Sequence, residues 1–488
     1  MQRGPYQRRP MQGGNPGPAQ NRPYGNYAGA AQRRPMNRAE YEIMLRKRKQ
    51  QNIIAIGALV LILALIVTAV ILILSPGKPK DAAVSNVSAV VEQAPKADEV
   101  PVNEPAADQN ADAGEPAAPA APVVPVATAA PAAPANPEAA FRTGELRSVR
   151  MRVAGDIMVT MDQLKYAVAA GYSFYDQFAL ISDVLGNADY TMANMETTIG
   201  KYKDKQYSGY PLFNAPEQVL DPLRDAGVDF FTLANNHMLD RWFDGMKNTV
   251  DWMDKYGFGH VGAYRTKEER LTPVVKEVGG IKIGFLAYTH STNTQEKVCD
   301  PAAVEYGVPY LNKSDFSGDV KRLRDAGAEV IIAFPHWGDE YVRTPDSNQQ
   351  SYARKLANAG VDIILGSHSH MVQPMGYQNV TVDGKAKRVF TMFSLGNFIS
   401  THTVEYTDSG IILDFTINEQ PDGTFTCDNV QYIPTYCWLH DNTVQVLPSG
   451  RYINNRPANM DSASYDKMVK SYNDMVDLIG AEFSVLGV

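Results

Sequence analysis

One uninterrupted apolar run decides how the rest of this sequence is organised. The run extends over Ile53–Leu74, 22 residues without a charged side chain. At about 1.5 Å of rise per residue, a helix of that length crosses a hydrocarbon core of roughly 30 Å. A cleaved signal peptide has a shorter apolar core of about 7–15 residues, followed by small residues at its cleavage site. The run therefore predicts a retained transmembrane helix over residues 53–75 that acts as a signal anchor.

The basic residues beside this run predict its orientation. Four consecutive basic residues at positions 46–49 precede the run, whereas Lys78 and Lys80 follow it. Because the more cationic flank of a membrane helix stays in the cytoplasm, the N-terminus is expected inside the cell. We therefore expect a single-pass protein of the cell membrane whose chain lies outside the cell after about residue 75.

The net charge of −8 is an average over regions of opposite sign. Residues 1–50 hold 11 basic and 2 acidic residues. Rich in Gly, Pro, Gln, Asn and Arg, they predict a disordered basic cytoplasmic tail that contacts anionic lipid. Such tails commonly serve as topology signals, so no nucleic-acid partner is expected. Residues 76–140 are rich in Ala and Pro, hold ten prolines between 94 and 140, and predict an extended acidic spacer.

Residues 141–488, with a net charge of −11, have the composition of one extracellular globular domain. The three cysteines of the chain are too few for a disulfide framework or a zinc ribbon, and pairing of Cys427 with Cys437 stays open. Strand-like and helical patterns alternate, which predicts an α/β fold. Strands running into loops are predicted over 149–156, 188–196, 228–237, 280–289, 328–338, 361–370, 387–398 and 409–435. Helices are predicted over 175–185, 215–226, 245–256, 314–326, 347–359 and 459–480.

Polar residues come directly after several of these apolar runs. They are Asp156, Glu196, Asn235, Asn236, His237, His336, His368, His370 and Asn397. Since the carboxyl ends of strands in α/β sheets open onto the ligand crevice, these side chains can converge on one site. Carboxylate, amide and imidazole groups without thiolate are ligands suited to Mn, Zn, Fe or Ni.

Two of the histidines, His368 and His370, can reach the same volume from one side of an extended segment or loop end. Ordinary structural roles are assigned to the four remaining histidines. They are His260, His290, His402 and His440, of which His290 and His402 also follow apolar runs.

Six short motifs, in order along residues 148–400, resemble the CapA family of bacterial capsule-synthesis proteins. The motifs are AGDIM (154–158), ANMETT (193–198), LANNHMLD (233–240), HWGDEY (336–341), GSHSHMVQP (366–374) and SLGNF (394–398). The best-known members of this family are the membrane-anchored component of poly-γ-glutamate synthesis. The resemblance implies a calcineurin-like metallophosphoesterase fold, an α/β/β/α sandwich whose metal ligands lie on loops after strands.

The resemblance also implies roles for individual residues. His237 would act on the leaving group, and the implied ligands of a divalent metal ion (Mn, Zn or Fe) are Asp156, Glu196, Asn236, His336, His368 and His370. The sequence departs from the phosphoesterase pattern at three positions: Met158 stands in place of a His, Glu196 in place of an Asp, and Asn235 in place of a Gly.

Two classes of function are compatible with these residues. The first is a metal-dependent envelope hydrolase or transferase, in which His237 protonates the leaving group and Glu340 is a base or supports a ligand. It would act in the biosynthesis, attachment or export of an anionic surface polymer, or alone as an envelope phosphoesterase. The second is a non-catalytic component that binds polymer within a membrane-bound synthesis complex. Because the domain carries −11, capturing a polyanion would require a local basic or metal-bearing groove.

Overall fold

The computed structural model describes residues 145–200, 207–441, 443–480 and 482–486. The predicted tail (1–50), membrane helix (53–75) and spacer (76–140) lie outside these residues and stay predictions. Among the described residues, no helix combines the length and apolar character that crossing a bilayer requires.

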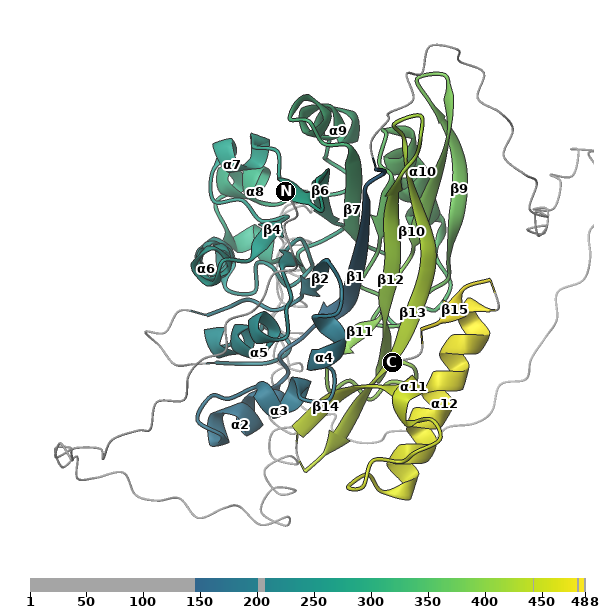
Figure 1. Cartoon of the computed structure of the whole chain (residues 1–488). Helices are drawn as coiled ribbons and strands as arrows, with labels where there is room; N and C mark the ends of the chain where they lie inside the picture. Colours follow the sequence, from purple (N-terminus) through teal and green to yellow (C-terminus); the bar gives the residue numbers. More distant parts are fainter. Residues whose placement is uncertain (1–144, 201–206, 442, 481, 487–488) are drawn as a thin grey trace, which may run out of the picture. The chain divides into compact units, whose positions relative to one another are not determined.

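In the described part of the chain, nine strands form a first sheet with parallel strands on one side and antiparallel strands on the other (Figure 1). Its order is β14-β13-β12-β1-β2-β3-β4, with β11 also paired to β1 and β15 to β13. The strands are β1 (Ser148–Ile157), β2 (Tyr190–Met195), β3 (Phe230–Thr232), β4 (Gly259–Val261), β11 (Asn397–Ile399), β12 (Ser409–Glu419), β13 (Phe425–His440), β14 (Thr443–Pro448) and β15 (Ser484–Val485). Strands β1, β2, β3 and β4 are parallel neighbours, so their carboxyl ends lie at one edge.

A second sheet has the order β5-β6-β7-β8-β10-β9. Its strands are β5 (Val275–Val278), β6 (Ile281–Thr289), β7 (Val330–His336), β8 (Ile363–Leu365), β9 (Met375–Val382) and β10 (Lys385–Met392). Strands β6, β7, β8 and β10 run parallel.

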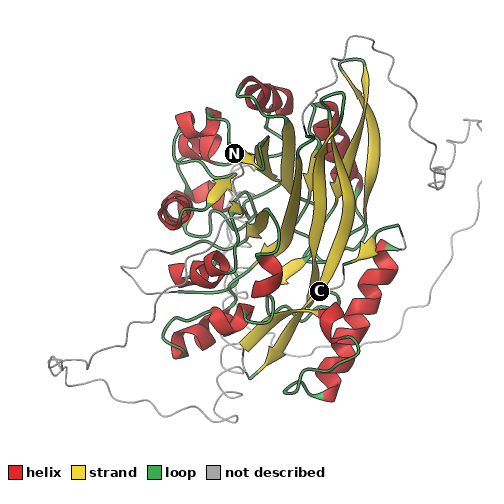
Figure 2. Ribbon diagram, viewed as in Figure 1, coloured by secondary structure: helices red, strands yellow, loops and turns green. Residues whose placement is uncertain are grey.

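The two sheets pack face to face, with helices on their outer faces (Figure 2). One apolar core joins side chains of both sheets, among them Val153 of β1 and Ile332 of β7. A second core joins the first sheet to its helices, and a third joins the second sheet to α9 and α10. The result is a mixed α/β fold of four layers. The helices are α2 (Met161–Ala169), α3 (Tyr175–Phe178), α4 (Ser182–Leu185), η2 (Glu217–Val219), α5 (Leu220–Asp225), α6 (Trp242–Tyr256), α7 (Lys267–Leu271), η3 (Gln295–Val298), α8 (Pro301–Gly307), α9 (Phe316–Asp325), α10 (Ser347–Asn358), α11 (Ser449–Tyr452) and α12 (Ser462–Ile479).

Strand β1 shows how the sequence positions the site. Val149, Met151 and Val153 alternate toward the core between the sheets, as a period of two requires. On the opposite face Arg152 is buried, and its Nε lies 2.6 Å from Asp414 Oδ2 on β12. This ion pair ties β1 to β12 along the strand that ends in Asp156.

The observed elements differ from the predicted ones in two ways: one predicted helix is divided, and several observed elements, among them α7, α8, β4, β5, β9 and β14, were not predicted. The single helix predicted over 175–185 is two short helices, because the chain bends between α3 and α4 and buries Ile181 in the core. Helix α2 was not predicted, although Thr160 and Gln163 form a capping box at its start. The predicted strand and helix positions otherwise match observed elements, and the described cysteines are unpaired.

Candidate metal centre

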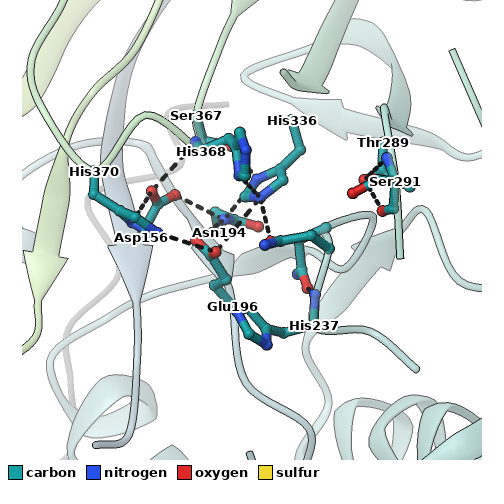
Figure 3. Close-up of polar contacts among 12 residues, drawn as sticks. Asp156, Asn194, Glu196, His237, Thr289, Ser291, His336, Ser367, His368 and His370 are labelled. Carbon is teal, nitrogen blue, oxygen red and sulfur yellow. Dashed lines mark hydrogen bonds and ion pairs between the residues drawn. The ribbon is translucent and has the colours of Figure 1, made fainter. Parts of the chain in front are cut away.

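Residues far apart in the sequence meet at the carboxyl ends of strands from both sheets (Figure 3). Asp156 is the next-to-last residue of β1 and Glu196 follows β2 directly. His336 is the last residue of β7. All six predicted ligands are buried, and each exposes 4% of its surface or less: Asp156, Glu196, Asn236, His336, His368 and His370.

The first group of ligand atoms surrounds Nε2 of His336. Asn236 Oδ1 lies 2.8 Å from this nitrogen, His368 Nδ1 3.1 Å and Glu196 Oε1 3.4 Å. All four of these atoms can carry lone pairs that accept hydrogen bonds. A proton on one of the two imidazole rings cannot serve as the donor for every contact among them. Glu196 Oε1 is buried without a hydrogen-bond partner among the described residues. Such an oxygen needs a cation or a donor, because an unpaired buried polar atom is costly.

The second group comprises Asp156, Glu196 and His370, whose ligand atoms lie within 4.8 Å of one another. Asn397 donates its amide hydrogen to the carbonyl of Thr407 over 2.9 Å, so its Oδ1 accepts from Nδ1 of His370 at 3.1 Å. In the neutral tautomer that makes this bond, the lone pair of His370 Nε2 faces Glu196 Oε1 at 3.8 Å. Two lone pairs therefore face each other, and a cation between them would stabilise both.

The electrostatics of the cluster also favour a cation. Burial raises the pKa of Glu196 well above its ordinary value, and the neighbouring Asp156 raises it further. Burial lowers the pKa of His336 and His368 well below the ordinary value, and nearby imidazoles add to the effect. Metal binding requires neutral imidazoles, which burial favours here, and ionised carboxylates, which a bound cation would stabilise. The nitrogen and oxygen donors present thus fit a Mn, Zn or Fe ion.

The backbone around the two neighbouring histidines is strained. His368 has φ of 99° and His370 has φ of 57°, so neither continues an extended strand. The backbone N–H of His368 donates to Asp156 Oδ2 over 3.3 Å, which fixes the turn to the carboxylate. Residues held in such conformations cost on the order of 1–3 kcal/mol and cluster at functional sites. The two imidazoles converge through this turn rather than through strand alternation.

A family model described as "Bacterial capsule synthesis protein PGA_cap" matches residues 150–402, just over half of the chain. The chain belongs to this family. It is 25% identical over 294 residues to the capsule biosynthesis protein CapA of Bacillus anthracis, covering 59% of this chain and 67% of that protein. It is also 25% identical over 275 residues to the PGA biosynthesis protein CapA of Bacillus subtilis (strain 168), covering 56% and 68%.

Two solved structures also resemble this PGA_cap protein. One is the calcineurin-like phosphoesterase YfkN from Bacillus subtilis, with 15% identity, a TM-score of 0.35 and coverage of 68% of this chain and 99% of that chain. The other is the Haemophilus influenzae NAD nucleotidase, with 13% identity, a TM-score of 0.38 and coverage of 69% and 64%. Both TM-scores lie below 0.5.

His237 of this PGA_cap chain has a partner of its own. Its Nδ1 lies 2.8 Å from Asp240 Oδ2, which also accepts the backbone N–H of Phe213 over 2.7 Å. The Phe213 ring packs against the imidazole edge-on, with centroids 4.6 Å apart. Burial raises the pKa of Asp240, while the hydrogen bond from His237 opposes that rise. The imidazole is thus held in one orientation beside the ligand loop.

Sequence reasoning missed two side chains that support the ligands. Asn194 donates to Asp156 Oδ1 over 2.8 Å and lies 3.4 Å from Glu196 Oε2, so one amide orients both carboxylates. Ser367 Oγ lies 2.8 Å from Nδ1 of His336. The spacing of Asn194, two positions before Glu196, could have revealed it, because alternate residues of a strand share a face.

The structure also locates Glu340, which was predicted to take part in the chemistry, and His290 and His402, which were not. Glu340 is exposed on the loop after β7, outside the two ligand groups, and its charge helps to raise the pKa of Glu196. His290 and His402, which were assigned ordinary structural roles, both lie beside the ligands. Their ring centroids are 4.3 Å from His368 and 5.0 Å from His370, respectively.

Proposed function

We propose that this PGA_cap protein is a membrane-anchored extracellular hydrolase or transferase that depends on a divalent metal ion. It would act in the biosynthesis, attachment or export of an anionic cell-surface polymer of the poly-γ-glutamate type. One observation carries the metal dependence: Glu196 Oε1, buried without a hydrogen-bond partner in the described residues, has imidazole nitrogens at 3.4 and 3.8 Å. The names of the two CapA relatives support the polymer, and the apolar run at 53–74 supports the anchor.

The layers and the ligand loops support a calcineurin-like metallophosphoesterase fold for the domain. Two sheets pack face to face, and donors from both meet where parallel strands end. Such an edge is where α/β sheets place their ligands. The residues that would hold the ion are Asp156, Glu196, Asn236, His336, His368 and His370.

A bound divalent ion polarises a phosphoryl or carbonyl oxygen and lowers the pKa of bound water toward neutrality. The chain's own residues prepare for that chemistry. Asn194 holds the two carboxylates toward each other, Ser367 contacts one imidazole, and Asn397 fixes the ring proton of His370 on Nδ1. Contacts of this kind orient ligands and raise their basicity.

His237 is the residue we assign to proton transfer. Because its Nδ1 is engaged by Asp240, the other ring nitrogen, Nε2, is the one that can release or take up a proton at a substrate. The buried carboxylate would stabilise the charged imidazole. His237 would thus protonate the leaving group while the ligand residues stay fixed.

A cavity of about 330 Å³ beside the centre offers room for substrate. Its lining runs from His402 to Lys467 and Lys470 of α12. Lys470 pairs with Glu405 over 3.2 Å and with Asp474 over 2.7 Å, so its charge is already compensated. The lining holds Lys467 and Lys470 against the acidic Glu405, Asp408 and Asp474, so this cavity would not capture a polyanion by charge alone. This balance favours a metal-dependent reaction over binding without catalysis.

The test measures metal in the full-length protein, purified in detergent, by inductively coupled plasma mass spectrometry. We expect bound Mn, Zn or Fe in the wild type and a loss of most of it in Glu196→Ala. His260→Ala is the matched control, because His260 pairs with Asp254 away from the ligand groups. A wild type that binds no metal would refute the proposal. If Asp156→Asn/His370→Ala still supports polymer formation in cells, the protein acts by binding and not by catalysis.

A further inference from the structure

His402 carries a buried nitrogen that no other residue described in the structure satisfies. Its Nδ1 is inaccessible to solvent and has no hydrogen-bond partner among those residues. The backbone N–H of His402 lies 3.3 Å from Ser400 Oγ, which ties the residue to its own loop. A buried imidazole nitrogen without a partner is costly, so it points to a ligand that the protein itself does not supply.

The register of β11 brings His402 to the second ligand group. Strand β11 pairs in parallel with β1, Asp156 opposite Asn397 and Ile157 opposite Ile399. Beyond these strands the two segments stay together, because the N–H of Met158 donates to the carbonyl of Ile399 over 3.0 Å. The loop that carries His402 therefore runs beside the end of β1, which carries Asp156.

The side chain of Met158 offers no ligand of the kind that the neighbouring positions provide. Thr160 Oγ1 and Thr401 Oγ1 lie 2.7 Å apart, so residue 401 is level with residue 160 of the adjacent segment. Met158 is buried and supplies only a thioether there. On the adjacent segment, the residue after Thr401 is His402, which carries an imidazole.

The rings of His402 and His370 lie as close as the rings of two imidazoles that share one ion, although the ligand atoms within 4.8 Å of one another in the second group are those of Asp156, Glu196 and His370. Their ring centroids are 5.0 Å apart with an interplanar angle of 87°. Two imidazoles bound to one ion at about 2.1 Å have ring centres about 4.5–5.2 Å apart for right-angled to tetrahedral arrangements. His336 and His368, which share the first ligand group, have centroids 4.7 Å apart.

We propose that His402 is the nitrogen ligand that completes a second cation position with Asp156, Glu196 and His370. Glu196 is then common to both positions, because its Oε1 lies near His336 of the first group and His370 of the second. Four oxygen and nitrogen donors suffice for a tetrahedral divalent ion. This inference rests on the proposed metal dependence and adds to it the number of ions and a ligand outside the six motif residues.

The experiment counts cations in the full-length protein. Metal is removed with a chelator, Co²⁺ is titrated in, and bound equivalents are measured by visible absorption and by mass spectrometry. We expect two equivalents in the wild type and one in His402→Ala, with the remaining equivalent bound as tightly as the corresponding one in wild type. His260→Ala should keep both equivalents, and circular dichroism checks that each variant is folded.

A second variant separates a lost ligand from damaged packing. Met158→His in the His402→Ala background places an imidazole on the adjacent segment and should restore the second equivalent. Two equivalents retained by His402→Ala alone, or one equivalent in the wild type, would overturn this inference and leave the proposed function standing. No Co²⁺ bound by the wild type would instead refute the proposed function itself. A folded His402→Ala/Met158→His protein with one equivalent would also count against His402 as a ligand.

Discussion

Replacing Glu196 with Gln should change stability in opposite directions with and without metal. Glu196 is fully buried beside Asp156, and burial together with that neighbour raises its pKa well above the ordinary range. At neutral pH the folded protein without metal therefore bears the cost either of burying the Glu196 carboxylate or of protonating it, whereas the unfolded chain bears neither. Glu196→Gln removes this cost and should make the metal-free protein more stable than the metal-free wild type.

The metal-bound proteins should show the reverse order. An ion at about 100 times its dissociation constant stabilises the folded state by about 2.7 kcal/mol per position. Residues 141–488 make a domain of 348 residues. At about 2.1 cal/mol/K per residue, its unfolding entropy is roughly 0.7 kcal/mol/K, so one bound ion raises Tm by about 4 °C. Glu196→Gln should gain less than about 1 °C, because the negative charge common to both ligand groups is gone.

Calorimetry of the full-length protein with chelator and with added Mn²⁺ measures both effects, with His260→Ala as the matched control. The stability difference between the metal-free proteins should also narrow as the pH falls. Because the pKa of Glu196 is raised in the folded protein, the folded protein protonates this side chain at a higher pH than the unfolded chain does. The buried negative charge is then lost. An equal metal-dependent rise in Tm for Glu196→Gln and wild type would refute the reasoning. A metal-free variant less stable than metal-free wild type would refute the assigned cost of the carboxylate.

Three further perturbations test the scaffold and the proton donor. Asp414→Asn leaves the buried Arg152 without a counter-charge and should lower the free energy of unfolding, measured with denaturant, by about 3–5 kcal/mol. A loss below about 1 kcal/mol would contradict this prediction. Gly155→Ala would place a Cβ 2.0 Å from the carbonyl oxygen of Gly396, so it should lower both Tm and metal content. Gly376→Ala, with no atom within 4 Å of the added carbon, should change neither. His237→Asn should abolish polymer formation in cells yet keep wild-type metal content, and a loss of metal would show that His237 binds the ion instead.

The positions of the longer central strands and the buried polar residues at their ends could be predicted because both depend on local pattern. Alternating or continuous apolar runs marked β1, β2 and β7, and the first polar residue after each run marked the edge where parallel strands end. Asp156 and His336 were found in this way from sequence alone, and Glu196 likewise followed its run directly. Their convergence follows from the parallel arrangement, which brings these ends to the same side.

Local conformation at the ligands could not be predicted in the same way. The motif around His368 and His370 predicts an extended segment or a loop end, and it does not reveal that both residues take positive φ. Hydrogen bonds from distant residues, such as the one between Asp156 and the N–H of His368, hold that turn. The bend between α3 and α4 likewise depends on burial of Ile181, a packing effect that no helical periodicity contains.

His402, which was assigned an ordinary structural role, lies beside the centre because of a strand pairing that its local sequence does not reveal. Strand β11 has three residues, too few to produce a periodic signal, yet its pairing with β1 joins positions about 240 apart in the sequence. That pairing sets Asn397 against His370 and brings His402 into the same neighbourhood. A reading that follows each motif along its own strand assigns His402 an ordinary structural role, because its partners belong to other segments. The second ligand group is thus a property of the β1–β11 register, and a change that shifts this register should disturb Asp156 and His402 together.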